Sequence, residues 1–221
     1  MKKALLLLSG GQDSTTCLYW AKEKFNYIKA IGFNYGQKHI KELDYARDIC
    51  RSEKIDFTII QLNNILSNSA LLDYNADINI NHPSNEKLPN SFVPGRNLIF
   101  LSIASTIALN NDIENIIIGV CETDYSGYPD CRKKFIDSIE KSIRLAYDKK
   151  IKIHTPLMKL DKAQTWKLAK KLGCINIIIN KTMSDYNGSI KKNEWGFGKL
   201  DNPASKLRKE GYFNAKSKNW I

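Results

Sequence analysis

The start of the chain constrains its fold more than any other segment. Residues 4–8 are apolar throughout, as is typical of a strand buried on both faces of a parallel sheet. Ser9, Gly10 and Gly11 end this run, and residues 14–25 then carry apolar side chains at helical spacing. Residues 27–33 follow as a second strand. This order predicts a β-α-β unit whose first strand lies at the centre of the sheet.

The alternation of helix and strand continues along the chain. Helices are predicted over residues 38–54, 98–109, 133–147 and 161–173, and strands over residues 57–62, 116–119 and 151–155. The last of these helices begins at Asp161, which forms a capping-box pattern with Gln164. We therefore predict an α/β fold with a parallel sheet and helices on both faces. Residues 63–94 lack this periodicity and are predicted to form a lid or a binding loop.

The character of the chain changes after residue 180. Beyond it the sequence is basic, and glycines alternate with aromatic residues. We predict a first domain over residues 1–180 and a small irregular extension over residues 181–221 that packs on it. The whole chain has 34 Lys and Arg against 23 Asp and Glu, a net charge of +11. That charge favours anionic ligands but does not choose between nucleotides, pyrophosphate and nucleic acid.

Two features of composition bear on location. The apolar run at the start spans only residues 4–8, whereas a membrane span needs roughly 20 residues, so neither export nor a membrane partner is expected. The five cysteines contain no CxxC pair, which favours reduced thiols. Both features predict a cytoplasmic protein.

Residues 9–14, Ser-Gly-Gly-Gln-Asp-Ser, join the first predicted strand to the first helix. Backbone N–H groups at such a junction converge beyond the carboxyl end of the strand, where anions bind. Gly10 and Gly11 leave room for a phosphate. Asp13 stands beside this phosphate site, so we assign it to magnesium coordination. The alternative interpretation is a strand-to-helix turn in which Ser14 or Asp13 caps the helix.

Five strings of this chain occur in the same order in a known family. They cover residues 9–18 (SGGQDSTTCL), 33–39 (FNYGQKH), 92–97 (FVPGRN), 119–132 (GVCETDYSGYPDCR) and 155–158 (TPLM). The first string resembles the pyrophosphatase loop of the N-type ATP pyrophosphatases, the PP-loop superfamily. Together the strings resemble the 7-cyano-7-deazaguanine synthases of queuosine biosynthesis. The resemblance implies a Rossmann-like sheet of the adenine nucleotide alpha hydrolase-like type.

The resemblance also implies an ATP-dependent ligase. Its substrates would be 7-carboxy-7-deazaguanine, ammonia and ATP, and its product 7-cyano-7-deazaguanine. Two successive adenylations are expected, the first leading to an amide and the second to a nitrile, and each releases AMP and pyrophosphate. A homodimer that uses Mg²⁺ and has no nucleic-acid partner is expected.

The predicted site residues follow from the loop and from the matching strings. Asp13, Ser14 and Arg96 are predicted to be catalytic. The ATP site is predicted to include Leu8, Ser9, Gly10, Gly11, Gln12, Asp13, Ser14, Thr15, Thr16, Cys17, Leu18, Tyr35, Gly36 and His39. The heterocyclic substrate is predicted to contact Arg96, Glu122, Thr123, Asp124, Tyr125, Tyr128, Asp130 and Arg132. In this set an acid would accept hydrogen bonds from the guanine-like edge, and a tyrosine would stack on the ring.

The C-terminal segment departs from the family pattern. The family holds a zinc ion with four cysteines there, but this chain has no cysteine after Cys174. The matching positions carry Asp185, Phe197, Leu200 and Ser205. Phe and Leu cannot bind zinc, so we predict that zinc is absent and that aromatic packing replaces it.

Two other functions stay open from the sequence alone. The basic C-terminal segment is also consistent with a PP-loop enzyme that adenylates a tRNA base or another carboxylate, although no RNA-binding motif is appended. The altered zinc positions are also consistent with a non-catalytic nucleotide-binding module. The intact loop with Asp13 argues against that module.

Overall fold

A five-stranded parallel sheet forms the centre of the protein, in the order β3-β2-β1-β6-β7. The computed structural model describes residues 1–38, 40–62, 65–66, 69–73, 81–82, 85–123 and 127–221. The strands are β1 (Lys3–Leu7), β2 (Tyr27–Asn34), β3 (Asp56–Gln61), β6 (Asn115–Ile117) and β7 (Lys152–His154). β1 is central because residues 4–7 are buried on both faces, and this confirms the predicted strand position.

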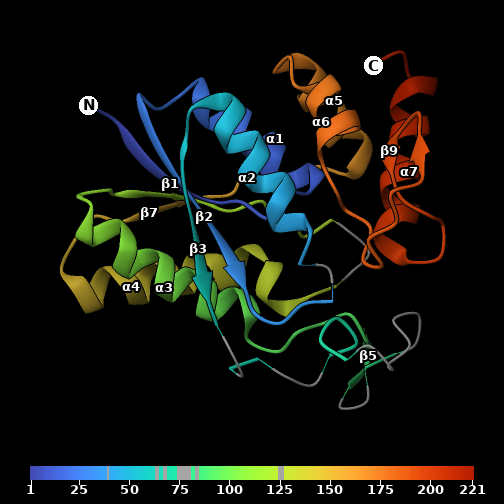
Figure 1. Cartoon of the computed structure of the whole chain (residues 1–221). Helices are drawn as coiled ribbons and strands as arrows, with labels where there is room; N and C mark the ends of the chain where they lie inside the picture. Colours follow the sequence, from blue (N-terminus) through green and yellow to red (C-terminus); the bar gives the residue numbers. More distant parts are fainter. Residues whose placement is uncertain (39, 63–64, 67–68, 74–80, 83–84, 124–126) are drawn as a thin grey trace.

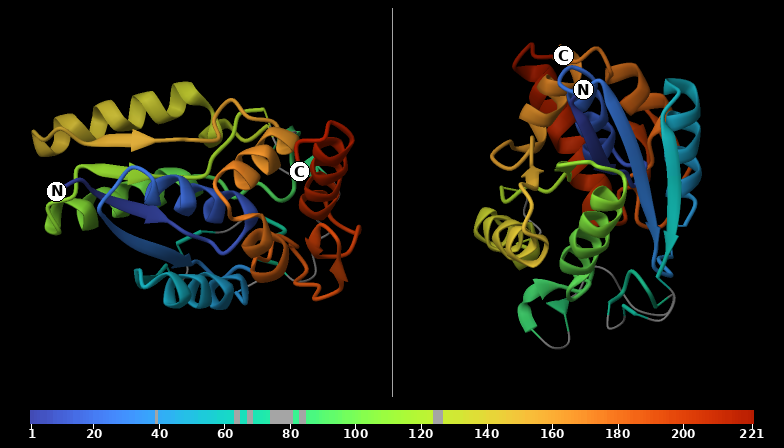
Figure 2. Two further views of the ribbon diagram at one scale, coloured as in Figure 1. Left: turned by 90° about the horizontal axis from the view of Figure 1, so that it is seen from above. Right: turned by 90° about the vertical axis from the view of Figure 1, so that its left-hand side faces the viewer.

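Helices cover both faces of the sheet (Figure 2). α1 (Gln12–Lys22) and α2 (Glu42–Glu53) pack on one face, where Leu6 and Leu8 of the first strand meet Leu18 and Ile49. α3 (Arg96–Asn110) and α4 (Lys133–Tyr147) pack on the other face. The predicted α/β fold is therefore confirmed.

The predicted helix boundaries shift by a few residues. α1 begins at Gln12, two residues before the predicted start, because Gly11 has an extended backbone and occupies the N-cap position. This places Asp13 in the first turn of α1. α3 begins at Arg96, so the arginine lies at the N-terminus of a helix whose sequence is mostly apolar.

Three more helices gather beside the carboxyl ends of the strands (Figure 1). They are α5 (Lys162–Lys171), α6 (Ile175–Lys181) and α7 (Pro203–Ser217), and they share a small core around Trp166 and Trp195. The capping box of Asp161 and Gln164 forms as predicted. The expectation of an irregular C-terminal region is wrong, because α7 spans 15 residues and is capped by the side chain of Asn202. Its apolar residues are few, so the helix depends on packing against α5.

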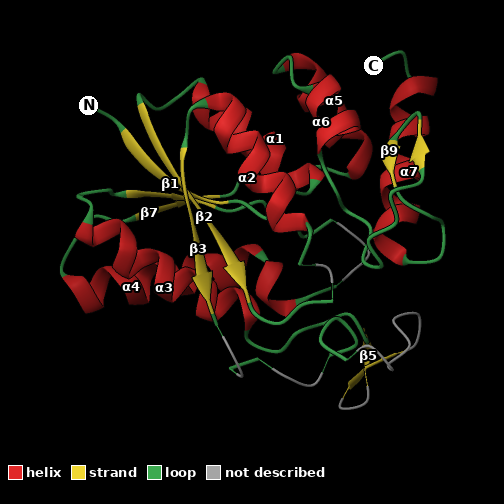
Figure 3. Ribbon diagram, viewed as in Figure 1, coloured by secondary structure: helices red, strands yellow, loops and turns green. Residues whose placement is uncertain are grey.

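The remaining elements are short (Figure 3). β8 (Lys192–Asn193) and β9 (Gly196–Phe197) form a hairpin beside α7, and the 3-10 helix η1 (Pro129–Cys131) precedes α4. The predicted lid region contains β4 (Asn81–His82) and β5 (Asn85–Pro89), which pair in antiparallel fashion. No helix within the described residues has the length and apolar character that a membrane span requires. The division of the chain at residue 180 stays a prediction.

Candidate active site

A pocket of about 310 Å³ lies where the strands β1, β2 and β6 end. Segments far apart in the sequence line it, from Leu7 in β1 to Arg208 in α7. Ligands of open parallel sheets bind at this edge, where the strand order reverses between β1 and β6. Leu71, from the predicted lid region, contributes to the wall.

The loop from Ser9 to Ser14 forms one side of this pocket. The Ser14 hydroxyl accepts a hydrogen bond from the Ser9 backbone N–H at 3.2 Å, and the two serine hydroxyls lie 3.1 Å apart. At Gly10, φ is +85° and a Cβ atom would lie 2.1 Å from the carbonyl oxygen of Glu42, so only glycine fits this turn. The loop is thus held tightly while the N-terminus of α1 opens into the pocket.

Polar atoms at the start of α1 are buried without protein partners. Among the described residues, the Asp13 Oδ1, the Gln12 Nε2 and the Thr15 Oγ1 make no hydrogen bond. Buried polar groups in native proteins are almost always satisfied, so the unpartnered atoms of Gln12 and Asp13, which line the pocket, indicate a ligand that supplies the missing bonds. Both a donor and a carboxylate acceptor are present, as an anion with an accompanying cation would require.

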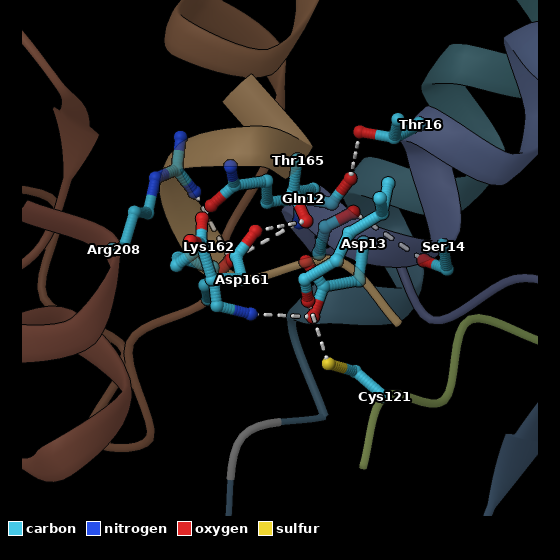
Figure 4. Close-up of polar contacts among 12 residues, drawn as sticks. Gln12, Asp13, Ser14, Thr16, Cys121, Asp161, Lys162, Thr165 and Arg208 are labelled. Carbon is cyan, nitrogen blue, oxygen red and sulfur yellow. Dashed lines mark hydrogen bonds and ion pairs between the residues drawn. The ribbon is translucent and has the colours of Figure 1, made fainter. Parts of the chain in front are cut away.

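Lys162 approaches this turn from α5 (Figure 4). Its ammonium group donates to the Asp13 Oδ2 at 2.8 Å, and the two side chains are only 15% and 29% exposed. The pairing leaves the other carboxylate oxygen of Asp13 without a partner. One carboxylate oxygen of Asp13 therefore pairs with a cationic side chain, and the second oxygen is available to bind a ligand.

Arg208 reaches the same side of the pocket from α7 (Figure 4). It is 1% exposed, and it donates to the Ser184 hydroxyl at 3.1 Å. That hydroxyl also accepts the backbone N–H of Gln12 at 3.1 Å. Burial lowers the pKa of Arg208 to about 10, while the Asp13 carboxylate acts in the opposite sense. Arg208 is still a cation at neutral pH.

An aromatic wall forms the other side of the pocket. Phe33 and Phe100 stack with ring centres 4.0 Å apart. The Arg96 guanidinium lies 5.9 Å from the centre of the Tyr128 ring, and Tyr128 is hydrogen-bonded to Ser91 at 2.6 Å. Burial lowers the pKa of Arg96, but the surrounding tyrosine hydroxyls outweigh this effect and raise it. Arg96 thus stays charged on a wall suited to a planar heterocycle with an anionic substituent.

Glu42, the first residue of α2, also lines the pocket. Desolvation raises the pKa of its carboxyl group to about 7, although a hydrogen bond from Gln37 and the charge of Arg96 lower it. The distance from Gln37 Nε2 to the Glu42 carboxylate is 3.3 Å. Half of these groups are therefore protonated near neutral pH.

The structure places the predicted ATP-site residues at different depths. Leu8, Ser9, Gly11, Gln12, Asp13, Ser14 and Tyr35 line the pocket. Gly10 shapes the loop from behind, and Thr15, Thr16, Cys17 and Leu18 are buried along α1 outside the pocket lining. Gly36 is exposed and is not part of the lining, and His39 lies outside the described residues.

Among the described residues predicted to contact the heterocyclic substrate, only some line the pocket. Arg96 and Tyr128 line the pocket, whereas the Asp130 carboxylate accepts the Asn97 N–H at 3.0 Å and thereby caps α3. Glu122 caps the start of α4 by accepting the Lys133 N–H at 3.0 Å. The other members, Thr123 and Arg132, are exposed and bond to backbone carbonyls, and Asp124 and Tyr125 lie outside the described residues. Two residues that were predicted to contact the substrate, Asp130 and Glu122, thus cap helices.

The four positions that match the zinc cysteines do not fit a zinc ion. The Asp185 Oδ2 accepts hydrogen bonds from Ser205 Oγ at 2.6 Å and Lys199 N at 2.9 Å, and its Oδ1 accepts those of Asn187 N and Ser189 N. These bonds lower the pKa of Asp185 against the effect of burial.

The described residues contain no cluster of His, Cys, Asp and Glu suited to a metal. Leu200 is 45% exposed, and Phe197 contacts Tyr45 at a ring distance of 6.2 Å. Aromatic packing was expected here, but hydrogen bonds to Asp185 do most of the linking.

Several pocket residues were not predicted from the sequence. They include Glu42, Lys162, Ser184, Tyr186 and Arg208. Lys162 directly follows the capping residue Asp161. A cation at the first position of a helix that follows a parallel strand indicates a residue near the ligand-binding edge of the sheet. Glu42 and Ser184 have no comparable local pattern.

The comparisons with known proteins show which family the chain resembles along nearly its whole length. Residues 3–216 match the family described as queuosine biosynthesis protein QueC. A 7-cyano-7-deazaguanine synthase from Clostridium botulinum is 46% identical over 96% of this chain and 95% of its own length. Synthases of the same name from Clostridium acetobutylicum and Lysinibacillus sphaericus are also 46% identical, over 97% and 95% of this chain and 95% and 94% of their own lengths.

Similarity to solved structures is more distant. A predicted subunit of a tRNA methyltransferase from Methanocaldococcus jannaschii is 18% identical, with a TM-score of 0.48 over 77% of this chain and 75% of that chain. The family match spans nearly the whole chain and includes the phosphate loop, and it confirms the resemblance seen in the sequence. The chain belongs to the QueC family of queuosine biosynthesis proteins.

Proposed function

We propose that this protein converts 7-carboxy-7-deazaguanine and ammonia into 7-cyano-7-deazaguanine at the expense of two ATP. The observation that carries the proposal is one continuous pocket with two chemically different walls. A phosphate loop with the unpartnered Asp13 Oδ1 forms one wall, and an aromatic surface with the cation Arg96 forms the other. Such a pocket suits ATP beside a planar carboxylate.

Activation of the substrate oxygen explains why ATP is consumed twice. A carboxylate oxygen attacks the α-phosphorus of ATP, and the bond to pyrophosphate breaks. Ammonia then attacks the carboxyl carbon, AMP leaves with that oxygen, and loss of a proton gives the amide. In the second round the amide oxygen attacks a new α-phosphorus and displaces pyrophosphate. The nitrogen then loses both of its protons and AMP leaves with the oxygen, which gives the nitrile. Each nitrile therefore costs two ATP and releases two AMP and two pyrophosphate.

The pocket side chains have distinct tasks in this scheme. Arg96 pairs with the substrate carboxylate and holds the attacking oxygen against the α-phosphate. Lys162 and the N-terminus of α1 stabilise the negative charge that builds up on pyrophosphate as it leaves. Ser14 orients the loop through its bonds to Ser9. Tyr128 lies against Arg96 and stacks on the heterocycle.

Magnesium fits the donors that are present. Mg²⁺ bound with nucleotides typically uses one or two carboxylates together with phosphate oxygens and water. Asp13 offers one buried carboxylate oxygen at the phosphate loop. When bound there, the ion would neutralise phosphate charge. We also propose a cytoplasmic homodimer without a nucleic-acid partner, as the resemblance implies, and light scattering in solution tests the dimer.

Product analysis tests the proposal. The protein is incubated with magnesium-ATP, ammonium and 7-carboxy-7-deazaguanine, and mass spectrometry separates AMP from ADP and amide from nitrile. We expect AMP and nitrile in a 2:1 ratio, with the amide as an intermediate. ADP and phosphate as products would overturn α-phosphate chemistry. Adenylation of tRNA with no conversion of the carboxylate would favour the tRNA-modifying alternative, and ATP binding without any turnover would favour a binding module.

A further inference from the structure

Arg208 is a buried cation that has no anionic partner within the part of the chain that the structure describes. Its side chain is 1% exposed, and within the described residues no carboxylate lies in ion-pair contact with it. Removing a charge from water costs several kcal/mol, and buried charges are therefore normally paired with an opposite charge. The missing partner of Arg208 points to an anionic ligand, because the guanidinium lines the pocket.

Neutral acceptors from three described residues hold the Arg208 guanidinium in place. Its Nε donates to the Trp195 carbonyl at 3.0 Å, its Nη2 to the Ile178 carbonyl at 2.7 Å and its Nη1 to the Ser184 hydroxyl. A guanidinium has five N–H donors, so these bonds fix its plane and leave donors for another acceptor. At Gly196 a Cβ atom would lie 2.2 Å from Nη2, which shows how closely β9 encloses this group.

The guanidinium is connected to the phosphate loop through one side chain, that of Ser184. The Ser184 hydroxyl that accepts from Arg208 also accepts the backbone N–H of Gln12. The next residue back, Met183, donates its N–H to the Gly10 carbonyl at 3.0 Å. Two hydrogen bonds thus tie the segment that carries Ser184 to the loop, and the Ser184 hydroxyl links Arg208 to the N-terminus of α1.

We propose that Arg208 is a phosphate-binding residue, which contacts the part of ATP that leaves as pyrophosphate. The proposal rests on the proposed function, because it requires that nucleotide phosphates occupy the loop. Arg208, Lys162 and the α1 N-terminus then surround one anion from three elements. The extra cation lowers the energy of the departing pyrophosphate in both adenylations. It also gives the C-terminal segment a role in the reaction, because α7 and β9 hold the arginine.

Pyrophosphate binding tests this role without any turnover. The Arg208→Gln variant removes the charge, and the Lys206→Gln variant removes a charge from an exposed position of the same helix as a matched control. Calorimetry with magnesium pyrophosphate should give at least about tenfold weaker binding for Arg208→Gln, as loss of one charged hydrogen bond predicts. Lys206→Gln should bind pyrophosphate like the unaltered protein.

Kinetics and stability separate a phosphate contact from a structural role. We expect the KM for ATP to rise in Arg208→Gln while the KM for 7-carboxy-7-deazaguanine stays unchanged. A purely structural role would reduce the folded fraction, which lowers kcat and leaves both KM values and the pyrophosphate affinity of the folded fraction unchanged. That result, or equal pyrophosphate affinity in both variants, would overturn the proposal.

A second variant covers the case in which Arg208→Gln does not fold. Arg208→Lys keeps the charge but loses the planar fork, so the rise in melting temperature on addition of pyrophosphate should shrink but persist. An undiminished rise would contradict the proposal. If the unaltered protein binds pyrophosphate but makes no AMP from the carboxylate, the proposed substrate fails while the role of Arg208 is still tested.

Discussion

Asp13 combines two environments in a single carboxylate. Its Oδ2 accepts from the ammonium of Lys162, whereas its buried Oδ1 has no partner among the described residues. A side chain arranged in this way contributes little to stability, because one half is unsatisfied until a ligand arrives. It is correspondingly suited to bind a cation that accompanies phosphate.

We therefore predict that Asp13→Asn abolishes adenylation with little effect on folding. AMP formation should fall by about 100-fold or more, because the amide is a weak ligand for Mg²⁺ and leaves Lys162 without its ion pair. The melting temperature should stay within a few degrees of the original, which scanning calorimetry measures. Near-normal AMP release by this variant would remove Asp13 from the site.

Glu42 makes the stability of the ligand-free protein depend on pH. Its pKa is raised from 4.5 to about 7 in the fold, so the folded state holds the proton more tightly than the unfolded chain. Between pH 4.5 and 7 unfolding thus releases protons, and the free energy of unfolding falls as the pH rises. Below this window Glu42 is protonated in both states and does not change the free energy of unfolding with pH. Above this window Glu42 is ionised in both states, and the loss of stability is complete.

The Glu42→Gln variant should remove this loss. We predict that it is more stable than the unaltered protein at pH 8, and that this advantage is about 2 kcal/mol smaller at pH 5. Urea unfolding at the two pH values measures both free energies. The exposed Glu114→Gln serves as the control and should show no such difference. An advantage for Glu42→Gln that does not change with pH would show that its carboxyl group is not desolvated.

At the scale of elements, the contact between α5 and α7 positions the cationic side of the pocket. A Cβ atom at Gly211 of α7 would lie 2.7 Å from the Lys162 Cγ and 2.9 Å from the Lys162 carbonyl carbon. The two helices therefore approach each other closely at the residue that pairs with Asp13. Trp166 of α5 strengthens this contact by donating to the Arg208 carbonyl at 3.2 Å.

Gly211→Ala should destabilise the protein although alanine favours helices. We expect a loss of about 1–3 kcal/mol in the free energy of unfolding, because the added methyl group forces the helices apart and outweighs the gain in helix propensity. AMP formation should fall with it as Lys162 moves. Denaturant unfolding measures the loss. Asn214→Ala, at an exposed position of α7, should be neutral or stabilising, and equal effects of both variants would contradict close packing.

At the scale of the whole molecule, hydrogen bonds to one carboxylate hold the parts of the C-terminal segment together. Asp185 gathers the backbone N–H groups of Asn187, Ser189 and Lys199 together with the Ser205 hydroxyl. The carboxylate is fully buried, and both of its oxygens are occupied. It thus performs the linking task that a zinc ion performs in the family this chain resembles.

We predict that the purified protein is folded and carries no stoichiometric zinc. Dialysis against a chelator should leave its melting temperature unchanged, because no bond of the Asp185 cluster depends on a metal. Elemental analysis and calorimetry measure both quantities. Zinc at one ion per chain after dialysis would show that metal ligands exist elsewhere in the protein.

The sequence by itself determined the framework of the fold and the phosphate-loop side of the site. The apolar run before Ser9, the glycines and the helical spacing that follows are local patterns, and local patterns suffice to place a phosphate loop at the end of a central strand. Asp13 and Arg96 could be predicted because each lies at a strand or loop end within such a pattern. The order of helices and strands up to residue 173 follows from the same periodicity.

Only the tertiary structure decided which side chains face Asp13. Lys162 is 149 positions away from it, and Ser184 is 172 positions from Gln12. These contacts depend on how α5 and α7 pack, which no local periodicity encodes. The same holds for Arg208, which stands in a basic segment where charge and hydropathy do not distinguish it from exposed Lys206. Burial separates the two residues, and burial is a property of the assembled fold.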